Sequence, residues 1–201
     1  MKEALIIGKT NVGKSLFLVN FTEFLGYKKI YLNIEGLDGK VLKKEMSIDI
    51  AIKYLSSNQK FKTKCLQFTE LKIPVSKGYK EIRIIDSSGL TDGIHPDLNI
   101  RCSIVQTLEK LENTGMIIHI VDLTEYIDEN INLISEIDKQ IIRFGSNKNN
   151  YILLANKIDL DKDGKGLRYL QSCFNNIRII PISALYRDGF NEVKSYVIKS
   201  L

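Results

Sequence analysis

Residues 6–15 read Ile-Ile-Gly-Lys-Thr-Asn-Val-Gly-Lys-Ser, and this stretch decides the fold. Four residues separate Gly8 from the triplet Gly13, Lys14 and Ser15, which is the spacing of the G-x-x-x-x-G-K-[ST] phosphate loop. A polyphosphate is bound by several backbone N–H groups that point at it, and glycine leaves room for that approach. The stretch therefore predicts a site for the phosphates of a nucleotide.

The side chains of this loop have distinct predicted roles. Lys14 brings a positive charge to the β- and γ-phosphates, and the hydroxyl of Ser15 is a ligand for Mg²⁺. The helix that begins here adds the positive end of its dipole. The residues of this loop that we expect to bind the nucleotide are Gly8, Val12, Gly13, Lys14, Ser15 and Leu16.

The flanking sequence has the context that the motif requires. Residues 4–7 are a short apolar run typical of a buried parallel strand. Residues 15–25 contain no glycine or proline and carry an apolar face at helical spacing, and Gly26 follows as a helix stop. A strand, a glycine-rich loop and a helix in this order favour the phosphate loop over a chance match.

Length and composition are those of an ordinary globular protein. The chain has 201 residues, of which 44% are hydrophobic and 26% charged, so we expect one domain with a full core. The three cysteines lie far apart without a C-x-x-C pair, which argues against a disulfide framework or a zinc site and suits a reducing cytosol. Because we find no signal peptide and no apolar run of membrane-spanning length, we expect a cytoplasmic protein.

The net charge of +5 is concentrated in one segment. Residues 27–64 contain nine lysines and four acidic residues, a difference of +5, and the charges in the rest of the chain balance. Such a segment suits RNA, the ribosome or an acidic protein as a partner. Few aromatic residues are interleaved with the lysines, so a solvated face explains the charge equally well.

Strand and helix patterns alternate along the chain. Apolar or alternating runs predict strands at residues 4–7, 65–75, 81–85, 116–121, 151–155 and 177–182, with a further short candidate at 29–34. Helical periodicity predicts helices at 15–25, 46–56, 97–113, 128–144, 167–174 and 189–201. This order implies an α/β fold, with a mostly parallel six-stranded sheet covered by helices on both faces. Pro74 cannot donate to a ladder, which predicts an edge position for the 65–75 strand.

Four motifs follow predicted strands, at residues 8–15, 86–89, 156–159 and 183–185. In open α/β sheets ligands bind beyond the carboxyl ends of the strands, so we expect the four loops to meet at one edge. In the second motif, D-x-x-G, the Asp86 carboxylate can hold Mg²⁺ through water, and the Gly89 N–H can reach the γ-phosphate. Asp and Gly are common in plain turns, so this motif alone is weak evidence, and its position after a strand and downstream of the phosphate loop makes it more specific.

The third motif, Asn156-Lys157-Ile158-Asp159, indicates which base is bound. Guanine presents its N1–H and its 2-amino group side by side, and the carboxylate of Asp159 can accept from both. Adenine would face Asp159 with an acceptor, and charge-assisted hydrogen bonds contribute about 1.5–3 kcal/mol each, so guanine is favoured by orders of magnitude. We expect the stem of Lys157 to lie along the base and Asn156 to tie this loop to the phosphate loop.

The last motif, Ser183-Ala184-Leu185, completes the predicted nucleotide site. We expect a backbone N–H of Ser183 or Ala184 to donate to the O6 atom of guanine, and Leu185 to lie beside them in the same contact. Together the four loops predict a site for GTP or GDP with Mg²⁺.

In these residues the chain resembles the translation-factor class of P-loop GTPases, and within it the Era/TrmE/EngA-like group. The four motifs agree in order and spacing, and the match spans nearly the whole chain. The resemblance implies a single GTP-binding domain over residues 1–201 that hydrolyses GTP and whose two switch segments sense the γ-phosphate. A nucleotide-dependent dimer is a further partner that the resemblance leaves open.

The resemblance also implies catalytic roles for Lys14, Asn11, Thr63 and Gly89. Asn11, which we also expect among the nucleotide-binding residues, matches a position at which relatives help to bind K⁺ beside the phosphates, where the cation can replace an arginine finger. Leu90 stands where Ras-like proteins carry a water-positioning glutamine. Hydrolysis without K⁺ or a partner is therefore expected to be slow, since even Ras with its glutamine turns over at only about 10⁻⁴ s⁻¹.

Two features depart from the pattern of these relatives. Residues 86–89 read Asp-Ser-Ser-Gly where many relatives have Asp-Thr-Pro-Gly, and the interval from Gly8 to Asp86 is long. The excess is the basic segment 27–64, which we interpret as an insertion that includes switch I. The switch I threonine that completes the Mg²⁺ shell is then Thr63, because its rival Thr69 lies inside an ordinary strand pattern.

Three functions remain as hypotheses from the sequence. The first is a GTPase switch that acts on RNA or ribosomes, a cellular role that rests on the resemblance alone. The second is a guanine-nucleotide-dependent interaction module with little or no hydrolysis. The third is a nucleic-acid-binding protein that uses the lysines of residues 27–64.

Overall fold

The computed structural model describes residues 1–36, 39–55, 65–91, 93–127 and 134–201. The strands are β1 (Lys2–Ile7), β2 (Lys29–Glu35), β3 (Val41–Ser47), β4 (Leu66–Val75), β5 (Gly78–Asp86), β6 (Met116–Asp122), β7 (Tyr151–Asn156) and β8 (Ile179–Ile182). The helices are α1 (Lys14–Phe24), α2 (Ile48–Leu55), α3 (Leu98–Asn113), the 3₁₀ turn η1 (Leu123–Tyr126), α4 (Glu136–Ser146), α5 (Lys165–Cys173) and α6 (Phe190–Ser200).

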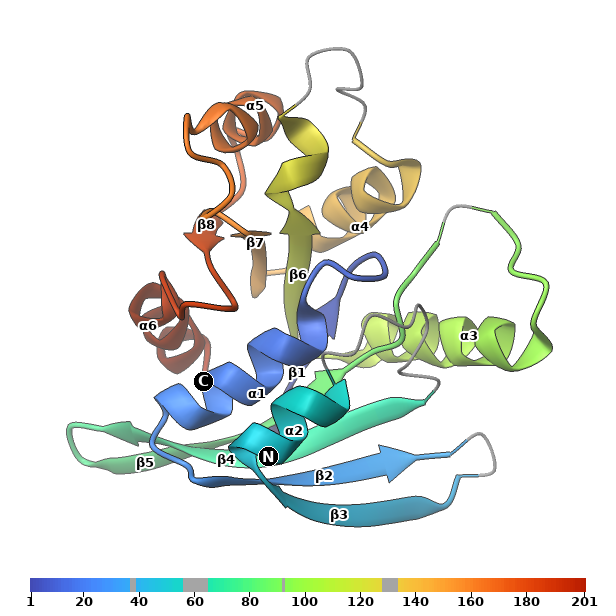
Figure 1. Ribbon diagram of the computed structural model, residues 1–201, viewed down its shortest axis with the longest axis vertical. Coiled ribbons are helices and arrows are strands. Elements are labelled where there is room, and N and C mark those ends of the chain that lie inside the picture. The colour runs from blue at the N-terminus through green and yellow to red at the C-terminus, as the bar shows by residue number, and fades with distance from the viewer. Residues whose placement is uncertain (37–38, 56–64, 92, 128–133) are drawn as a thin grey trace.

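The strands form one sheet in the order β3-β2-β4-β5-β1-β6-β7-β8 (Figure 1). β1 lies parallel to both of its neighbours, β5 and β6, and β7 and β8 continue the sheet in parallel. The strands β2, β3 and β4 pair in antiparallel fashion, and β4 is antiparallel to β5. The predicted α/β fold with a mostly parallel sheet is confirmed, but the described residues contain eight strands rather than six.

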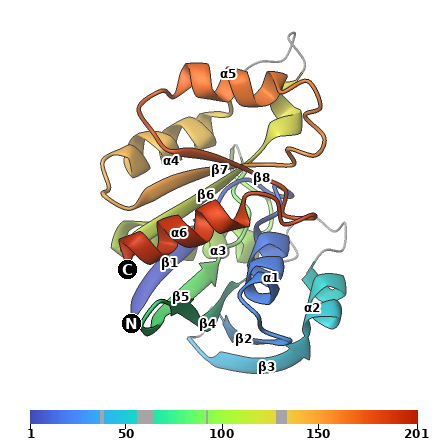
Figure 2. The ribbon, with the colours of Figure 1, turned by 90° about the vertical axis from the view of Figure 1, so that its left-hand side faces the viewer.

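Helices cover both faces of this sheet (Figure 2). On one face α1, α2 and α6 enclose a core in which the rings of Phe17 and Phe190 lie 5.2 Å apart, edge to face. On the other face α3, α4 and α5 contribute Leu111, Ile141 and Leu170 to a second core. The central strands are apolar on both sides because both of their faces are covered.

The strand that the sequence did not indicate is β3. It pairs with β2 over seven residue pairs, from Lys29 opposite Ser47 to Glu35 opposite Val41. β2 and β3, which belong to the basic segment, therefore extend the sheet by a hairpin, and the short candidate at 29–34 is β2. Most residues of β3 are exposed at the sheet edge, so the strand has no buried apolar stripe that a pattern could detect.

The prediction that residues 65–75 form an edge strand is wrong. β4 pairs with β5 along its length and with β2 over residues 66–68. Pro74 lies beyond the part of β4 that β2 reaches, so its missing N–H leaves no ladder bond unmade there. Further along this side, the backbone N–H of Lys72 donates to the hydroxyl of Tyr27 at 2.7 Å.

The helices lie close to their predicted positions, with one difference. The helix expected at 128–144 begins only at Glu136, where the side chain of Ser135 caps it, and residues 128–133 lie outside the described part of the chain. Among the helices of the described residues, none combines the length and apolar character that crossing a membrane requires.

The strand register brings the predicted loops to one edge. Ile6 at the end of β1 lies opposite Asp86 at the end of β5. Asn156 at the end of β7 lies opposite Asp122 on β6 and Ile182 on β8. The loops that follow β1, β5, β6, β7 and β8 therefore emerge at the same side of the sheet.

Candidate functional site

The phosphate loop connects β1 to α1 and is shaped by two glycines. Gly8 has φ 149° and Gly13 has φ 100°, values that favour glycine. A Cβ atom on Gly8 would lie 2.2 Å from the carbonyl oxygen of Ile120, and one on Gly13 would lie 2.3 Å from Nδ2 of Asn156. The loop is thus packed directly against β6 and β7, and a side chain at either position would displace it.

Lys14 begins α1, and its side chain folds back over the loop. Its Nζ donates to the carbonyl oxygens of Gly8 at 3.0 Å and Lys9 at 2.6 Å. Burial lowers the pKa of Lys14 to about 8, because the ammonium group has lost most of its water. Among the described residues Lys14 forms no direct ion pair, and an anion in the loop would supply one.

Ser15 and Asp86 meet as predicted for a Mg²⁺ site. The Ser15 hydroxyl donates to Oδ2 of Asp86 at 2.6 Å. Asp86 is fully buried, and its second oxygen, Oδ1, has no hydrogen-bond partner among the described residues. A hydroxyl beside a carboxylate with an unsatisfied buried oxygen fits Mg²⁺ that is bound in part through water.

Gln67 is a neighbour of this pair that the sequence did not indicate. It lies directly opposite Asp86 in the β4–β5 ladder, so the two Cβ atoms are about 4.5–5.5 Å apart. The Gln67 side chain is buried, and its Oε1 also has no partner in the described part of the chain. Two unsatisfied oxygens from adjacent strands form the polar lining that a bound water needs. Along the sequence Gln67 is one residue of an alternating strand, without a motif to mark it.

We expect Asp86→Asn to stabilise the nucleotide-free protein at pH 7.5. Burial raises the pKa of Asp86 to about 6 from its ordinary 3.8, although the Ser15 hydrogen bond and the charge of Lys14 oppose this shift. Between these two values the folded state holds a proton that the unfolded chain has released, so stability falls as the pH rises. Above pH 6 the charge costs roughly 3 kcal/mol, at about 1.4 kcal/mol per unit, and asparagine removes this cost.

Urea unfolding of both proteins at pH 7.5 and near pH 4 measures this effect. The variant should gain stability at the higher pH and lose most of that advantage at the lower one. Mg²⁺ together with GDP should stabilise the parent protein more than the variant. Equal unfolding free energies at pH 7.5 would show that the buried charge carries no cost.

Asn156 joins three of the predicted loops. Its Nδ2 donates to the carbonyl oxygen of Val12 at 2.7 Å, and its Oδ1 accepts from the N–H of Ala184 at 2.8 Å. The predicted tie between Asn156 and the phosphate loop is confirmed. Because both contacts are buried, they hold the loops after β1, β7 and β8 in one arrangement.

Asp159 lies half-buried in the turn that follows β7. Within the described residues, no hydrogen bond or ion pair engages its carboxylate. Both oxygens are therefore available to accept from a ligand that presents two donors side by side, as guanine does.

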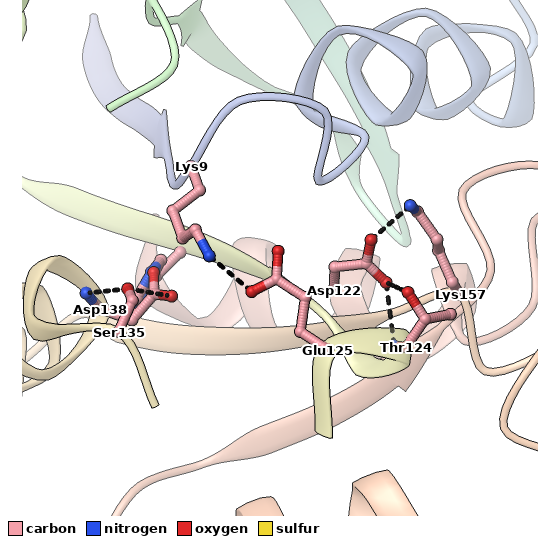
Figure 3. Close-up of polar contacts among 8 residues, drawn as sticks. Lys9, Asp122, Thr124, Glu125, Ser135, Asp138 and Lys157 are labelled. Atoms are coloured by element: carbon pink, nitrogen blue, oxygen red, sulfur yellow. Dashed lines mark hydrogen bonds and ion pairs between the residues drawn. The ribbon is translucent and has the colours of Figure 1, made fainter. Parts of the chain in front are cut away.

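The ammonium group of Lys157 is held by Asp122, the last residue of β6 (Figure 3). Lys157 has φ 67°, and the ion pair leaves its aliphatic stem as the part that can lie along a base. In the same view, Lys9 of the phosphate loop reaches Glu125 of η1 at 2.5 Å. The end of β6 and the turn η1 that follows it thus pair with one lysine from the phosphate loop and one from the loop after β7. The sequence did not indicate either acid, since both read as ordinary residues of a loop after a strand.

The 183–185 loop places its backbone donors differently from the expectation. The Ser183 N–H donates to the carbonyl oxygen of Asp188 at 3.3 Å, and the Ala184 N–H is taken by Asn156. The N–H of Leu185 has no acceptor among the described residues. Leu185 is therefore better placed than Ser183 or Ala184 to donate to a base.

Gly89 packs against the phosphate loop, where a Cβ atom would lie 2.5 Å from Cγ2 of Thr10. The next N–H, of Leu90, donates to the carbonyl oxygen of Gly8 at 3.1 Å. The side chain of Leu90 is 3% exposed and belongs to the core, so this position offers no polar group to a water molecule.

The remaining predicted residues lie in and around the same loops. Val12 is buried, Leu16 is half-buried in the first turn of α1, and Asn11 is exposed with φ 64°. Thr69 is a buried residue of β4 opposite Ile84, which agrees with its interpretation as an ordinary strand residue. Thr63, the predicted switch I ligand, lies outside the described residues.

Solved structures of similar fold include several GTP-binding domains. Era of Aquifex aeolicus matches with a TM-score of 0.62 at 21% identity, over 100% of this chain and 57% of the Era chain. The G domain of the T. maritima FeoB iron transporter matches with a TM-score of 0.57 at 16% identity, over 100% of this chain and 98% of the other. The bacterial selenocysteine-specific elongation factor EF-Sec matches with a TM-score of 0.57 at 15% identity, over 99% of this chain and 28% of that factor. The chain spans little more than half the length of the Era chains that it matches.

The family comparison agrees with these folds and with the motifs. The model of the 50S ribosome-binding GTPase family matches residues 3–157, which include the phosphate loop, the D-x-x-G loop and Asn156-Lys157. The predicted resemblance to Era-like P-loop GTPases is thereby confirmed. The chain belongs to the 50S ribosome-binding GTPase family.

Proposed function

We propose that this chain binds GTP with Mg²⁺ and hydrolyses it to GDP and phosphate as a molecular switch. The observation that carries this proposal is the pair of buried hydrogen bonds through which Asn156 joins the phosphate loop to the loop after β8. These bonds hold the start of the loop that carries Asp159, the residue predicted to read the base, against the loop that carries Lys14. An Era chain of the same fold has been crystallised with GDP·AlF4⁻, which supports the choice of ligand.

In the proposed site each group has a distinct task. Lys14 exchanges its bonds to two loop carbonyls for bonds to the β- and γ-phosphates. Ser15 and Asp86 hold Mg²⁺, which neutralises charge on the phosphate oxygens when it is bound. The N–H of Gly89 donates to the γ-phosphate, so the position of the segment that follows it depends on whether this phosphate is present.

Asn11 is the residue that we propose to assist K⁺ binding beside the phosphates. It is exposed at the loop, and no hydrogen bond holds its carboxamide within the described residues. Its oxygen is therefore available to a cation that the phosphates attract.

Single-turnover hydrolysis of GTP in KCl and in NaCl tests the proposal. We expect release of one phosphate per site in KCl with Mg²⁺ present, a slower reaction in NaCl, and none with EDTA. Binding of GTP without phosphate release in either salt would exclude hydrolysis by the chain alone.

A guanine-nucleotide-dependent interaction module with little hydrolysis is the second candidate. The burial of Leu90 favours it, because the side chain after Gly89 cannot orient a water molecule. The two candidates separate in the same assay, since the module would bind GTP tightly and leave it intact in both salts.

RNA, or the ribosome itself, is the partner that we propose for the basic segment 27–64. An Era structure in complex with nucleotides 1506–1542 of 16S ribosomal RNA supports this choice. On the described hairpin, the side chains of Lys40 and Lys43 are exposed to solvent. RNA binding should therefore weaken steeply with salt and be lost when Lys40 and Lys43 are changed to Glu. Binding that is unchanged by either treatment would leave an acidic protein, or a second copy in the GTP state, as the partner.

A further inference from the structure

Asn20 is a buried amide in the middle of α1 that belongs to none of the motifs. Its Nδ2 donates to the carbonyl oxygen of Ala184 at 2.7 Å, across 164 positions of the chain. Its Oδ1 has no hydrogen-bond partner among the described residues, and its neighbours Val19 and Phe21 are buried and apolar. Asparagine is a poor helix former, and an unpaired buried oxygen is destabilising, so packing alone does not account for this residue.

Asn20 and Asn156 together hold the backbone of Ala184 by hydrogen bonds to its carbonyl oxygen and its N–H. Asn156 accepts from the N–H of Ala184 at 2.8 Å, and Asn20 donates to its carbonyl oxygen at 2.7 Å. All three residues are only 2% exposed, so water does not compete for these bonds. Figure 2 shows how the loop between β8 and α6 lies beside α1, which allows a side chain of the first helix to reach it.

The carbonyl of Ala184 shares one peptide group with the N–H of Leu185. This group is planar and, like the other described peptide bonds, trans, so the oxygen and the N–H point in opposite directions. By drawing the oxygen toward α1, Asn20 turns the Leu185 N–H away from α1. That N–H has no acceptor in the described part of the chain.

We propose that Asn20 is a positioning residue for guanine recognition, which aims the Leu185 N–H at the 6-oxo group of the bound base. The inference rests on the proposed binding of guanine nucleotides and adds to it the residue that orients the backbone donor of this loop. Asn20 itself touches no part of the nucleotide, so its effect is confined to one edge of the base.

Three nucleotides, GDP, 6-thio-GDP and inosine diphosphate, distinguish contacts at this edge of the base from contacts at the rest of it. In 6-thio-GDP a sulfur atom, which is a weak acceptor, replaces the 6-oxo oxygen, while the donors that face Asp159 are kept. Inosine diphosphate keeps the 6-oxo oxygen but lacks the 2-amino group that Asp159 is predicted to read. The ratio of GDP to 6-thio-GDP affinity thus reports on the Leu185 donor, and the ratio of GDP to inosine diphosphate affinity reports on Asp159.

Calorimetric titrations of the parent protein, Asn20→Leu, Asn20→Ser and Thr22→Val with these nucleotides test the proposal. Thr22 is the matched control, because it is also buried and polar on α1, but among the described residues its hydroxyl bonds only to the carbonyl oxygen of Leu18 in its own helix. We expect the parent to prefer GDP over 6-thio-GDP about tenfold and both Asn20 variants to lower this preference to about twofold. The preference for GDP over inosine diphosphate should stay unchanged in every variant, and Thr22→Val should match the parent in both ratios.

A purely structural role of Asn20 would lower both ratios together or neither, and either result overturns the inference. A parent protein that binds GDP and 6-thio-GDP equally also overturns it, while the proposed function stands. A parent protein that binds no guanine nucleotide overturns both. Unfolding midpoints of the two Asn20 variants confirm that the comparison is made on folded protein.

Discussion

Lys14→Ala should lower the affinity for GDP and GTP by about 10²–10⁴-fold, which amounts to loss of binding at ordinary concentrations. Hydrogen bonds to charged groups contribute about 1.5–3 kcal/mol each, and Lys14 is expected to make two of them to the phosphates. The fold should survive the change, because within the described residues the buried amine bonds only to the carbonyl oxygens of Gly8 and Lys9, and its pKa is lowered to about 8. Calorimetry with GDP, together with thermal unfolding of the nucleotide-free protein, measures both effects.

Lys9→Ala is the matched control for this change. Lys9 lies in the same loop, but its ammonium group pairs with Glu125 at 2.5 Å (Figure 3). We therefore expect Lys9→Ala to weaken binding much less than Lys14→Ala. Nucleotide affinity that survives in Lys14→Ala would place the phosphates outside this loop and remove the basis of the proposed function.

Asp159→Asn should change the preference of the protein from GTP to XTP. Xanthine has an oxygen where guanine has the 2-amino group, so an asparagine amide can donate to it, whereas a carboxylate is repelled. Each charge-assisted hydrogen bond lost with guanine contributes about 1.5–3 kcal/mol, so the ratio of GTP to XTP affinity should fall by about 10²–10⁴-fold. The half-buried Asp159 carboxylate is engaged by no other described group, which makes an effect through the fold small.

Competition between GTP and XTP for the same protein measures this ratio directly. Asp163→Asn is the control, since Asp163 is exposed in the following turn and carries the same change of charge. The control should keep the preference for GTP. If Asp159→Asn also kept it, another group would have to read the base.

Much of the fold was predictable because the central strands and their helices have strong apolar patterns. Runs such as residues 116–121 and 151–155 are buried on both faces, and their predicted positions agree with β6 and β7. β3 was missed because an exposed edge strand has no buried face to impose a pattern. The edge position assigned to β4 failed because Pro74 reports only on its own part of a strand whose other end pairs on both sides.

The candidate site divides in a similar way. The meeting of Ser15 with Asp86 and of Asn156 with the phosphate loop follows from motifs whose chemistry lies in a few consecutive residues. The motifs did not predict which backbone N–H of residues 183–185 remains available to a base. Ala184 has its N–H taken by Asn156, and this depends on the distance between two loops rather than on either motif.

From the order and spacing of its residues alone, a nucleotide-binding α/β fold and a preference for guanine can be predicted for this chain, because the loop glycines and the proposed base-reading carboxylate of Asp159 act locally. Folding decides which distant side chains support those loops. Asn20 reaches Ala184 across 164 positions, Lys9 reaches Glu125 across 116, and Lys157 reaches Asp122 across 35. No local pattern encodes such pairs, since strand register and helix packing bring them within hydrogen-bonding distance only in the complete sheet.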